Sequence, residues 1–238
     1  MKGTRMGRRR SWIAIGLSGV VVAVASVAAI MPASAGEYFG YNGASVNRLP
    51  SDDDCARRVR ADSRPENKSA NYWFNRTTGR RLSGNEFERR VTGNFTGSTE
   101  DILRWGACKW GVDENAVKAQ AVVESWWNQN NRGGAHGILQ VERAYNEWVY
   151  FGGGGNVSES TAMNVDYALM RWRECEAGRW TWLNTVERGW NYGPGDGWGC
   201  LGVWGTGKWH TWAANEYIGR VQHEQRVRQW ETNRWFRQ

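Results

Sequence analysis

The chain has 238 residues, with 31 lysines and arginines, 24 aspartates and glutamates, and 17 tryptophans. This length suits one domain, or one domain with an extension, and excludes two large independent cores. A mean hydropathy of −0.69 excludes a polytopic membrane protein. The formal charge of +7 suggests nucleic acid as a partner, whereas the tryptophans suggest cores, interfaces or the faces of ligands such as sugars.

The amino terminus has the three parts of a secretory signal peptide. Five basic residues within the first ten precede an apolar run from Trp12 to Ile30, and Ala33 and Ala35 suit a signal peptidase. We therefore expect residues 1–35 to be a signal peptide, exported by the general or the twin-arginine route. An uncleaved membrane anchor is the alternative, because the apolar run is nearly long enough to span a bilayer.

Most of the net positive charge comes from this export segment. Without its five basic residues the chain has 26 basic against 24 acidic residues, a net charge of +2. We therefore expect no nucleic-acid partner.

An even number of cysteines in an exported protein predicts disulfides. The four cysteines are Cys55, Cys108, Cys175 and Cys200. Three pairings are possible, and we favour the first cysteine with the second and the third with the fourth, because each pair closes a moderate loop. The three histidines, His136, His210 and His223, are scattered along the chain. We therefore expect neither a metal site nor a cofactor.

The polarity of the chain changes near residue 98. Residues 36–97 are polar, with turn-rich stretches such as Ser51–Asp54, and we expect an extension that lies against the main domain and is partly disordered before Cys55. Residues 98–238 carry the helical patterns of that domain.

Four helices are predicted from caps and from apolar residues at helical spacing. They cover residues 98–110, 113–125, about 158–177, and a long stretch from about 211 toward 230. Little of the sequence resembles a strand. The predicted fold class is mainly α, with long loops and little or no sheet.

One carboxylate has surroundings that suit chemistry. Glu124 lies among aliphatic and indole side chains near the end of a predicted helix, where burial and the negative helix end would raise its pKa. A carboxylic acid still protonated near neutral pH can act as a general acid in glycoside cleavage. The ordinary alternative is a solvated glutamate on a helix surface.

Three segments then resemble one family. Glu124-Ser125, the sequence GAHGILQ at 134–140 and the sequence GWNYGPG at 189–195 resemble the E-S, G-A-x-G-L-M-Q and A-Y-N-A-G-P-G motifs of soluble lytic transglycosylases. This lysozyme-like family cuts bacterial peptidoglycan. The resemblance covers roughly residues 99–195 and implies a lysozyme-like domain whose partner is the peptidoglycan glycan strand, in a secreted or wall-associated protein. We expect a monomer.

The resemblance also implies roles for individual residues. Glu124 matches the single catalytic acid/base, and Ser125 matches a serine that orients that carboxylate or the substrate's N-acetyl group. Gly137 and Gln140 match the loop that lines the cleft, and Asn191 matches an asparagine that contacts substrate or supports the acid.

Two departures accompany these matches. Trp190 stands where the family has tyrosine, so a phenolic hydroxyl near the acid is lost unless Tyr192 or another tyrosine replaces it. The stretch between Glu124 and the glycine loop is also shorter than the family spacing. Trp126 and Trp127 suit core packing and sugar stacking equally well.

The resemblance implies a substrate-assisted reaction that makes 1,6-anhydromuramic acid and needs one enzyme carboxylate. Two alternatives stay open: a hydrolytic muramidase with a second carboxylate, and a non-catalytic module that binds wall glycan. The second carboxylate would be one of Glu142, Glu147, Glu159 and Asp166.

Two further patterns carry less weight. Residues 202–208 fit G-x-x-x-x-G-K, but Trp209 follows and no strand precedes, so we expect no nucleotide. Four arginines near the carboxyl terminus suit a solvated helix face, or else weak contact with anionic wall polymers or a membrane surface. They are Arg226, Arg228, Arg234 and Arg237.

Overall fold

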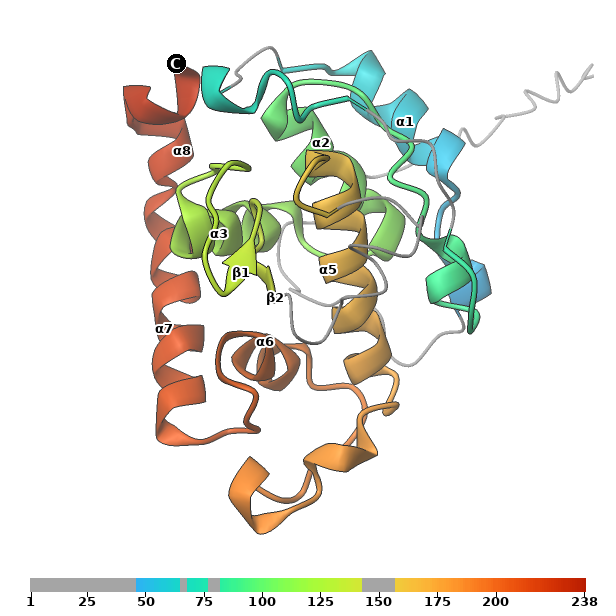
Figure 1. Ribbon diagram of the computed structural model, residues 1–238, viewed down its shortest axis with the longest axis vertical. Helices are drawn as coiled ribbons and strands as arrows, with labels where there is room; N and C mark the ends of the chain where they lie inside the picture. Colours follow the sequence, from blue (N-terminus) through green and yellow to red (C-terminus); the bar gives the residue numbers. More distant parts are fainter. Residues whose placement is uncertain (1–45, 65–67, 77–81, 143–156) are drawn as a thin grey trace, which may run out of the picture. The chain divides into compact units, whose positions relative to one another are not determined.

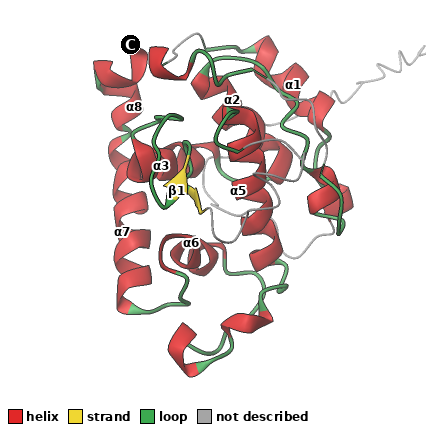
Figure 2. Cartoon of the chain, in the orientation of Figure 1, coloured by secondary structure: helices red, strands yellow, loops and turns green. Residues whose placement is uncertain are grey.

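The computed structural model describes residues 46–64, 68–76, 82–142 and 157–238 (Figure 1). The expected signal peptide lies outside these residues. The described part is mainly helical with one small sheet (Figure 2), which confirms the predicted fold class. Among the described helices, none has the length and apolar character needed to cross a membrane.

The first three predicted helices are confirmed, the first two together with their predicted caps. Helix α2 (Thr99–Trp110) begins after Ser98, whose side chain accepts a hydrogen bond from a main-chain N–H, and ends at Gly111 in the left-handed conformation. Asp113 caps α3 (Glu114–Ser125) and Ser160 caps α5 (Thr161–Glu176) in the same way as Ser98.

The last predicted helix is shorter than expected. Helix α7 (Trp212–Val227) begins after Thr211 as predicted, but it ends at Arg228, which adopts a left-handed φ of 49°. A short helix α8 (Gln229–Thr232) and a 3-10 helix (Arg234–Arg237) follow. The chain therefore turns before Trp230, and the four arginines do not share one helix.

Two helices were not predicted. The Ser51–Asp54 stretch, read as a turn, is the start of α1 (Asp52–Ala61): the Ser51 side chain caps the helix, and three aspartates occupy its first turn, where the helix dipole favours negative charge. Helix α6 (Gly197–Thr206) is glycine-rich, and its glycines allow close contact with α7: a Cβ on Gly202 would lie 3.0 Å from the Cβ of Ala214.

The remaining elements are short. Strands β1 (Ala135–His136) and β2 (Val141–Glu142) pair antiparallel, with Ala135 opposite Glu142. The other 3-10 helices are Val46–Arg48, Ser69–Asn71, Glu88–Arg90, Thr181–Leu183 and Val186–Arg188.

Two hydrophobic cores support the fold. The larger one joins α2, α3 and α5 and includes side chains from the segment before residue 98, such as Val59, Val91 and Phe95. The smaller one surrounds a disulfide between α5 and α6. Its members are Cys175, Trp180, Leu183, Tyr192, Cys200, Val203 and Trp209.

Both favoured disulfide pairings are confirmed. Cys55–Cys108 joins α1 to α2, and Cys175–Cys200 joins α5 to α6. Disulfides are typical of proteins outside the cytoplasm, which agrees with an exported chain.

Candidate functional site

Glu124 lies in the last turn of α3 and is half-buried. Burial raises the pKa of its carboxyl group to about 7, and this effect outweighs two opposing ones. The Tyr217 hydroxyl on α7 donates a hydrogen bond to Oε1 of Glu124, and the Arg220 guanidinium adds a positive charge. Both interactions lower the pKa of Glu124. The group is therefore only partly ionised at neutral pH and can both donate and accept a proton.

Ser125 connects the end of α3 to the glycine loop. Its hydroxyl donates a hydrogen bond to the Ile138 carbonyl (2.8 Å) and accepts one from the Asn128 N–H (3.1 Å). A hydroxyl has a single proton, and the acceptors in reach of Ser125 are two main-chain carbonyls, the near one of Ile138 in the loop and the more distant one of Ala121 (3.3 Å). In this structure the residue positions the loop, whereas the family resemblance implies that it orients the acid or the substrate's N-acetyl group.

Two buried amide side chains hold the main chain of the same loop through hydrogen bonds. Gln129 accepts from the Ile138 N–H (2.9 Å), and Asn164 accepts from the Leu139 N–H (2.9 Å). The Asn164 amide also donates to the His136 carbonyl (2.9 Å). Both side chains are fully buried, so the loop conformation is tied to the core.

Gly137 provides the turn that the loop needs. Its φ is +81°, and a Cβ at this position would lie 2.2 Å from Nδ2 of Asn164. Its carbonyl accepts from the Gln140 side chain (2.7 Å), which holds that side chain against the loop. Gln140 itself has a left-handed φ of 48°.

Helix α6 brings the loop and the acid together at one end. The Trp204 indole donates to the Leu139 carbonyl (3.0 Å), and a Cβ on the next residue, Gly205, would lie 2.5 Å from the Tyr217 ring. The loop and the Glu124–Tyr217 pair therefore meet near the carboxyl end of α6. We call Glu124, Tyr217, Gln140 and Trp204 the acid site.

The third motif belongs to a different part of the structure. The Tyr192 hydroxyl donates to the Cys175 carbonyl and accepts from the Trp180 N–H, so it serves the smaller core. Trp190 and Asn191 are exposed. The phenol that meets Glu124 comes from Tyr217 instead.

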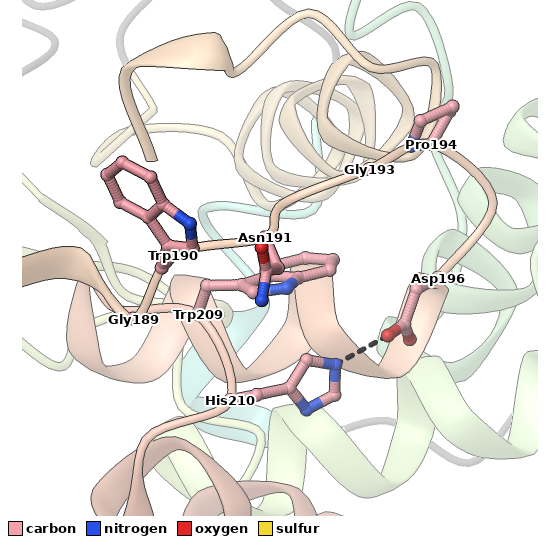
Figure 3. Close-up of a pocket in the computed structure, with 8 residues that line it drawn as sticks. All are labelled: Gly189, Trp190, Asn191, Gly193, Pro194, Asp196, Trp209 and His210. Carbon is pink, nitrogen blue, oxygen red and sulfur yellow. Dashed lines mark hydrogen bonds and ion pairs between the residues drawn. The ribbon is translucent and has the colours of Figure 1, made fainter. Parts of the chain in front are cut away.

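Trp190 and Asn191 line a cavity of about 440 Å³ beside the amino end of α6 (Figure 3). Its lining residues are Gly189, Trp190, Asn191, Gly193, Pro194, Asp196, Trp209 and His210. Glu124 is not among them. The structure thus brings the first two motifs together and leaves the third at the opposite end of α6.

The four candidates for a second catalytic carboxylate differ in their exposure to solvent. Asp166 is fully buried and accepts hydrogen bonds from the Lys109 ammonium (2.7 Å) and the Trp110 indole (2.7 Å), so it serves the core. Glu142 on β2 and Glu159 are exposed. Glu147 lies outside the described residues.

The two tryptophans after Ser125 have different environments. Trp127 is buried and donates its indole N–H to the Lys118 carbonyl (3.0 Å), which makes it a core residue. Trp126 is 46% exposed and stacks one face on Phe236.

Tyr217 is the site residue that the sequence did not identify. The sequence predicts only that Tyr192 or another tyrosine would replace the lost hydroxyl, without indicating which one. No family model, curated protein or solved structure matches the chain.

Proposed function

We propose that the protein is a peptidoglycan-cleaving enzyme of the lysozyme-like, lytic transglycosylase type, with Glu124 as its acid/base. The observation that carries this proposal is the Glu124 carboxyl group, half-buried, with a pKa of about 7 and a hydrogen bond from Tyr217. Such a group can give and take a proton in one catalytic cycle at neutral pH. The glycine loop is tied to the next residue, Ser125, by a hydrogen bond to the Ile138 carbonyl.

In the first step, Glu124 protonates the oxygen between N-acetylmuramic acid and N-acetylglucosamine as the bond from that oxygen to C1 of muramic acid breaks. The acetamido oxygen of the muramic acid bonds to C1 and takes up the positive charge. In the second step, the Glu124 carboxylate removes the proton from the 6-hydroxyl. The 6-oxygen then displaces the acetamido group at C1, closes a 1,6-anhydro ring and leaves Glu124 protonated again.

The surroundings of the acid favour this route over one with two carboxylates. Asp166 is fully buried beneath four hydrogen-bond donors and cannot reach a substrate. Among the described alternatives, Glu142 is exposed on the hairpin that follows the glycine loop. Glu159 is exposed as well but lies outside this hairpin, so Glu142 is the residue that we test as the water-activating carboxylate of a hydrolytic muramidase.

The first experiment replaces the acid. We expect Glu124→Gln to reduce lysis of purified peptidoglycan by at least about 100-fold, the usual contribution of a general acid. Glu231→Gln is the matched control, because Glu231 on α8 is exposed and outside the acid site, and it should keep full activity. Unchanged lysis by Glu124→Gln would overturn the proposal. Glycan binding without lysis by the unmodified protein would favour a non-catalytic module.

A second experiment separates the two enzymatic reactions. Mass spectrometry of the products should find muramic acid ends that are lighter by one water than reducing ends, because the 1,6-anhydro ring forms without hydrolysis. Glu142→Gln should retain this activity. Reducing ends, together with loss of activity in Glu142→Gln, would identify a hydrolase instead.

A further inference from the structure

The cavity at the amino end of α6 has a rigid frame. The Trp209 N–H donates to the Arg188 carbonyl (2.6 Å), and a Cβ on Gly189 would lie 1.9 Å from the Trp209 carbonyl oxygen. The two loops that form the cavity are therefore in direct contact. The Cys175–Cys200 disulfide and the smaller core lie beneath them.

Three residues that line this cavity have a strained backbone conformation with positive φ. Trp190, Asn191 and His210 have φ values of 56°, 59° and 48°, and they are three of the seven non-glycine residues with positive φ in the described chain. This conformation is uncommon for side-chain-bearing residues and is an outlier for a bulky one such as tryptophan. Strain of this kind concentrates at binding and active sites, where it orients particular side chains.

The lining combines an aromatic face with polar groups. Figure 3 shows Trp190 at one end of the cavity and Pro194 and Asp196 at the other, with Asn191 and His210 between them. Trp190 is 54% exposed. His210 Nε2 lies 2.5 Å from Oδ2 of Asp196, whose other oxygen caps α6, so the imidazole is held in one orientation.

These features suit a sugar. A pyranose ring has an apolar face that packs on an indole and hydroxyl groups that need amide, imidazole or carboxylate partners at its edge. We propose that this cavity is a second glycan-binding site, which holds one pyranose ring of an N-acetylated glycan against Trp190, with Asn191 and His210 at its edge. The choice of this glycan rests on the proposed function, while the site is separate from the acid site.

The two sites lie at opposite ends of α6. Gly199 contacts the ring of Trp209 and Gly205 contacts Tyr217, and six residues of helix separate these positions by about 9 Å along the axis. A glycan strand of several rings exceeds this separation. Occupation of the second site should therefore strengthen the binding of long strands and leave the reaction at Glu124 intact.

The test measures binding without turnover. The probe is the hexamer of N-acetylglucosamine, titrated calorimetrically into the full protein carrying Glu124→Gln. We expect Trp190→Asn in this background to weaken binding about tenfold, the order that one lost aromatic contact gives. Asparagine tolerates positive φ, so the loop should keep its conformation. Trp190→Phe should restore part of the affinity.

The matched control is Trp73→Asn, which removes another exposed tryptophan (71% exposed) that does not line the cavity. It should bind like the parent. If Trp190→Asn misfolds by circular dichroism, Asn191→Asp replaces it, since aspartate also tolerates positive φ and removes the amide donor.

The outcomes distinguish this site from the proposed function. Equal affinity in the cavity variants and the parent, or no binding of the hexamer by the parent, would overturn the second site even if the protein lyses peptidoglycan. Conversely, Trp190-dependent binding by a protein without lytic activity would support the site and contradict the enzymatic proposal.

Discussion

At the scale of single residues, opposing influences set the pKa of Glu124. Burial raises it to about 7, and the Tyr217 hydroxyl opposes that rise. Tyr217→Phe removes the hydroxyl, so we expect the pKa to increase further. Because the protonated carboxyl is the acid, the alkaline limb of the pH profile of kcat/KM should move to higher pH. The maximal rate should fall several-fold, as for the loss of a hydrogen bond of about 1 kcal/mol.

This expectation is checked with pH–rate profiles of peptidoglycan lysis. Tyr72→Phe is the control, because Tyr72 is exposed and does not contact the acid. An unshifted alkaline limb in Tyr217→Phe would show that the phenol does not govern the proton affinity of Glu124.

The same carboxyl group also affects stability. Its pKa is about 7 in the folded chain and 4.5 as the ordinary value. The stabilisation from this raised pKa is fully present below pH 4.5 and is lost as the pH rises through 7, a difference of up to about 3 kcal/mol. We expect Glu124→Gln to gain stability relative to the unmodified protein between pH 4 and pH 8. Urea denaturation at both pH values measures this, and a difference that does not change with pH would contradict it.

At the scale of elements, the sequence predicts helices where a cap and apolar spacing coincide. Ser98, Asp113 and Ser160 each precede such a pattern, and each caps a helix. Helix α1 was missed because its polar sequence resembles a turn until Ser51 is recognised as its cap. Helix α6 was missed because glycine has low helix propensity, and the contact of Gly205 with Tyr217 becomes visible only in the folded chain.

The candidate site was predictable to a similar extent. Glu124, Ser125 and the glycine loop are close in sequence, and the structure brings them together through the bond from Ser125 to Ile138. Tyr217 lies 93 residues after Glu124. Its contact depends on how α7 packs against α3 and α6, which local sequence patterns do not determine.

Gly137 tests whether the loop conformation matters. Gly137→Ala would place a Cβ 2.2 Å from the Asn164 amide at a φ of +81°, and we expect a loss of about 1–3 kcal/mol in the free energy of unfolding. Lysis should also fall, because the Gly137 carbonyl holds the side chain of Gln140, a member of the acid site. Gly133→Ala is the control, since a Cβ there meets nothing within 4 Å. Equal stability of the two variants in urea denaturation would contradict the strain argument.

At the scale of the whole molecule, the two disulfides join different pairs of helices and belong to different cores. Cys55–Cys108 ties the segment before residue 98 to α2, and this segment adds Val59, Val91 and Phe95 to the larger core. Cys175–Cys200 instead supports the smaller core, which carries the third motif. The sequence places the three motifs in order along the chain. Their division between the two ends of α6 follows from which core each one joins.

The larger core contains a carboxylate whose role is opposite to that of Glu124. Asp166 is fully buried and accepts from the main-chain N–H groups of Thr92 and Gly93, the Lys109 ammonium and the Trp110 indole. Asp166→Asn would remove the charge that pairs with Lys109 and direct an amide N–H₂ at groups that are themselves donors. Lys109 keeps its ion pair with Asp52 (2.6 Å), so we expect a loss of about 3 kcal/mol in the free energy of unfolding, at the lower end for a broken buried pair.

Urea denaturation at pH 7 measures this loss, with Glu159→Gln as an exposed control that should change stability by no more than about 0.5 kcal/mol. At a temperature where Asp166→Asn remains folded, lysis per folded molecule should be retained, because Asp166 supports the core and does not touch the substrate. A variant that is stable yet inactive would instead make Asp166 the second carboxylate of a hydrolase. The two carboxylates therefore differ in a measurable way: Glu124 favours activity at the expense of stability above pH 7, and Asp166 stabilises the fold.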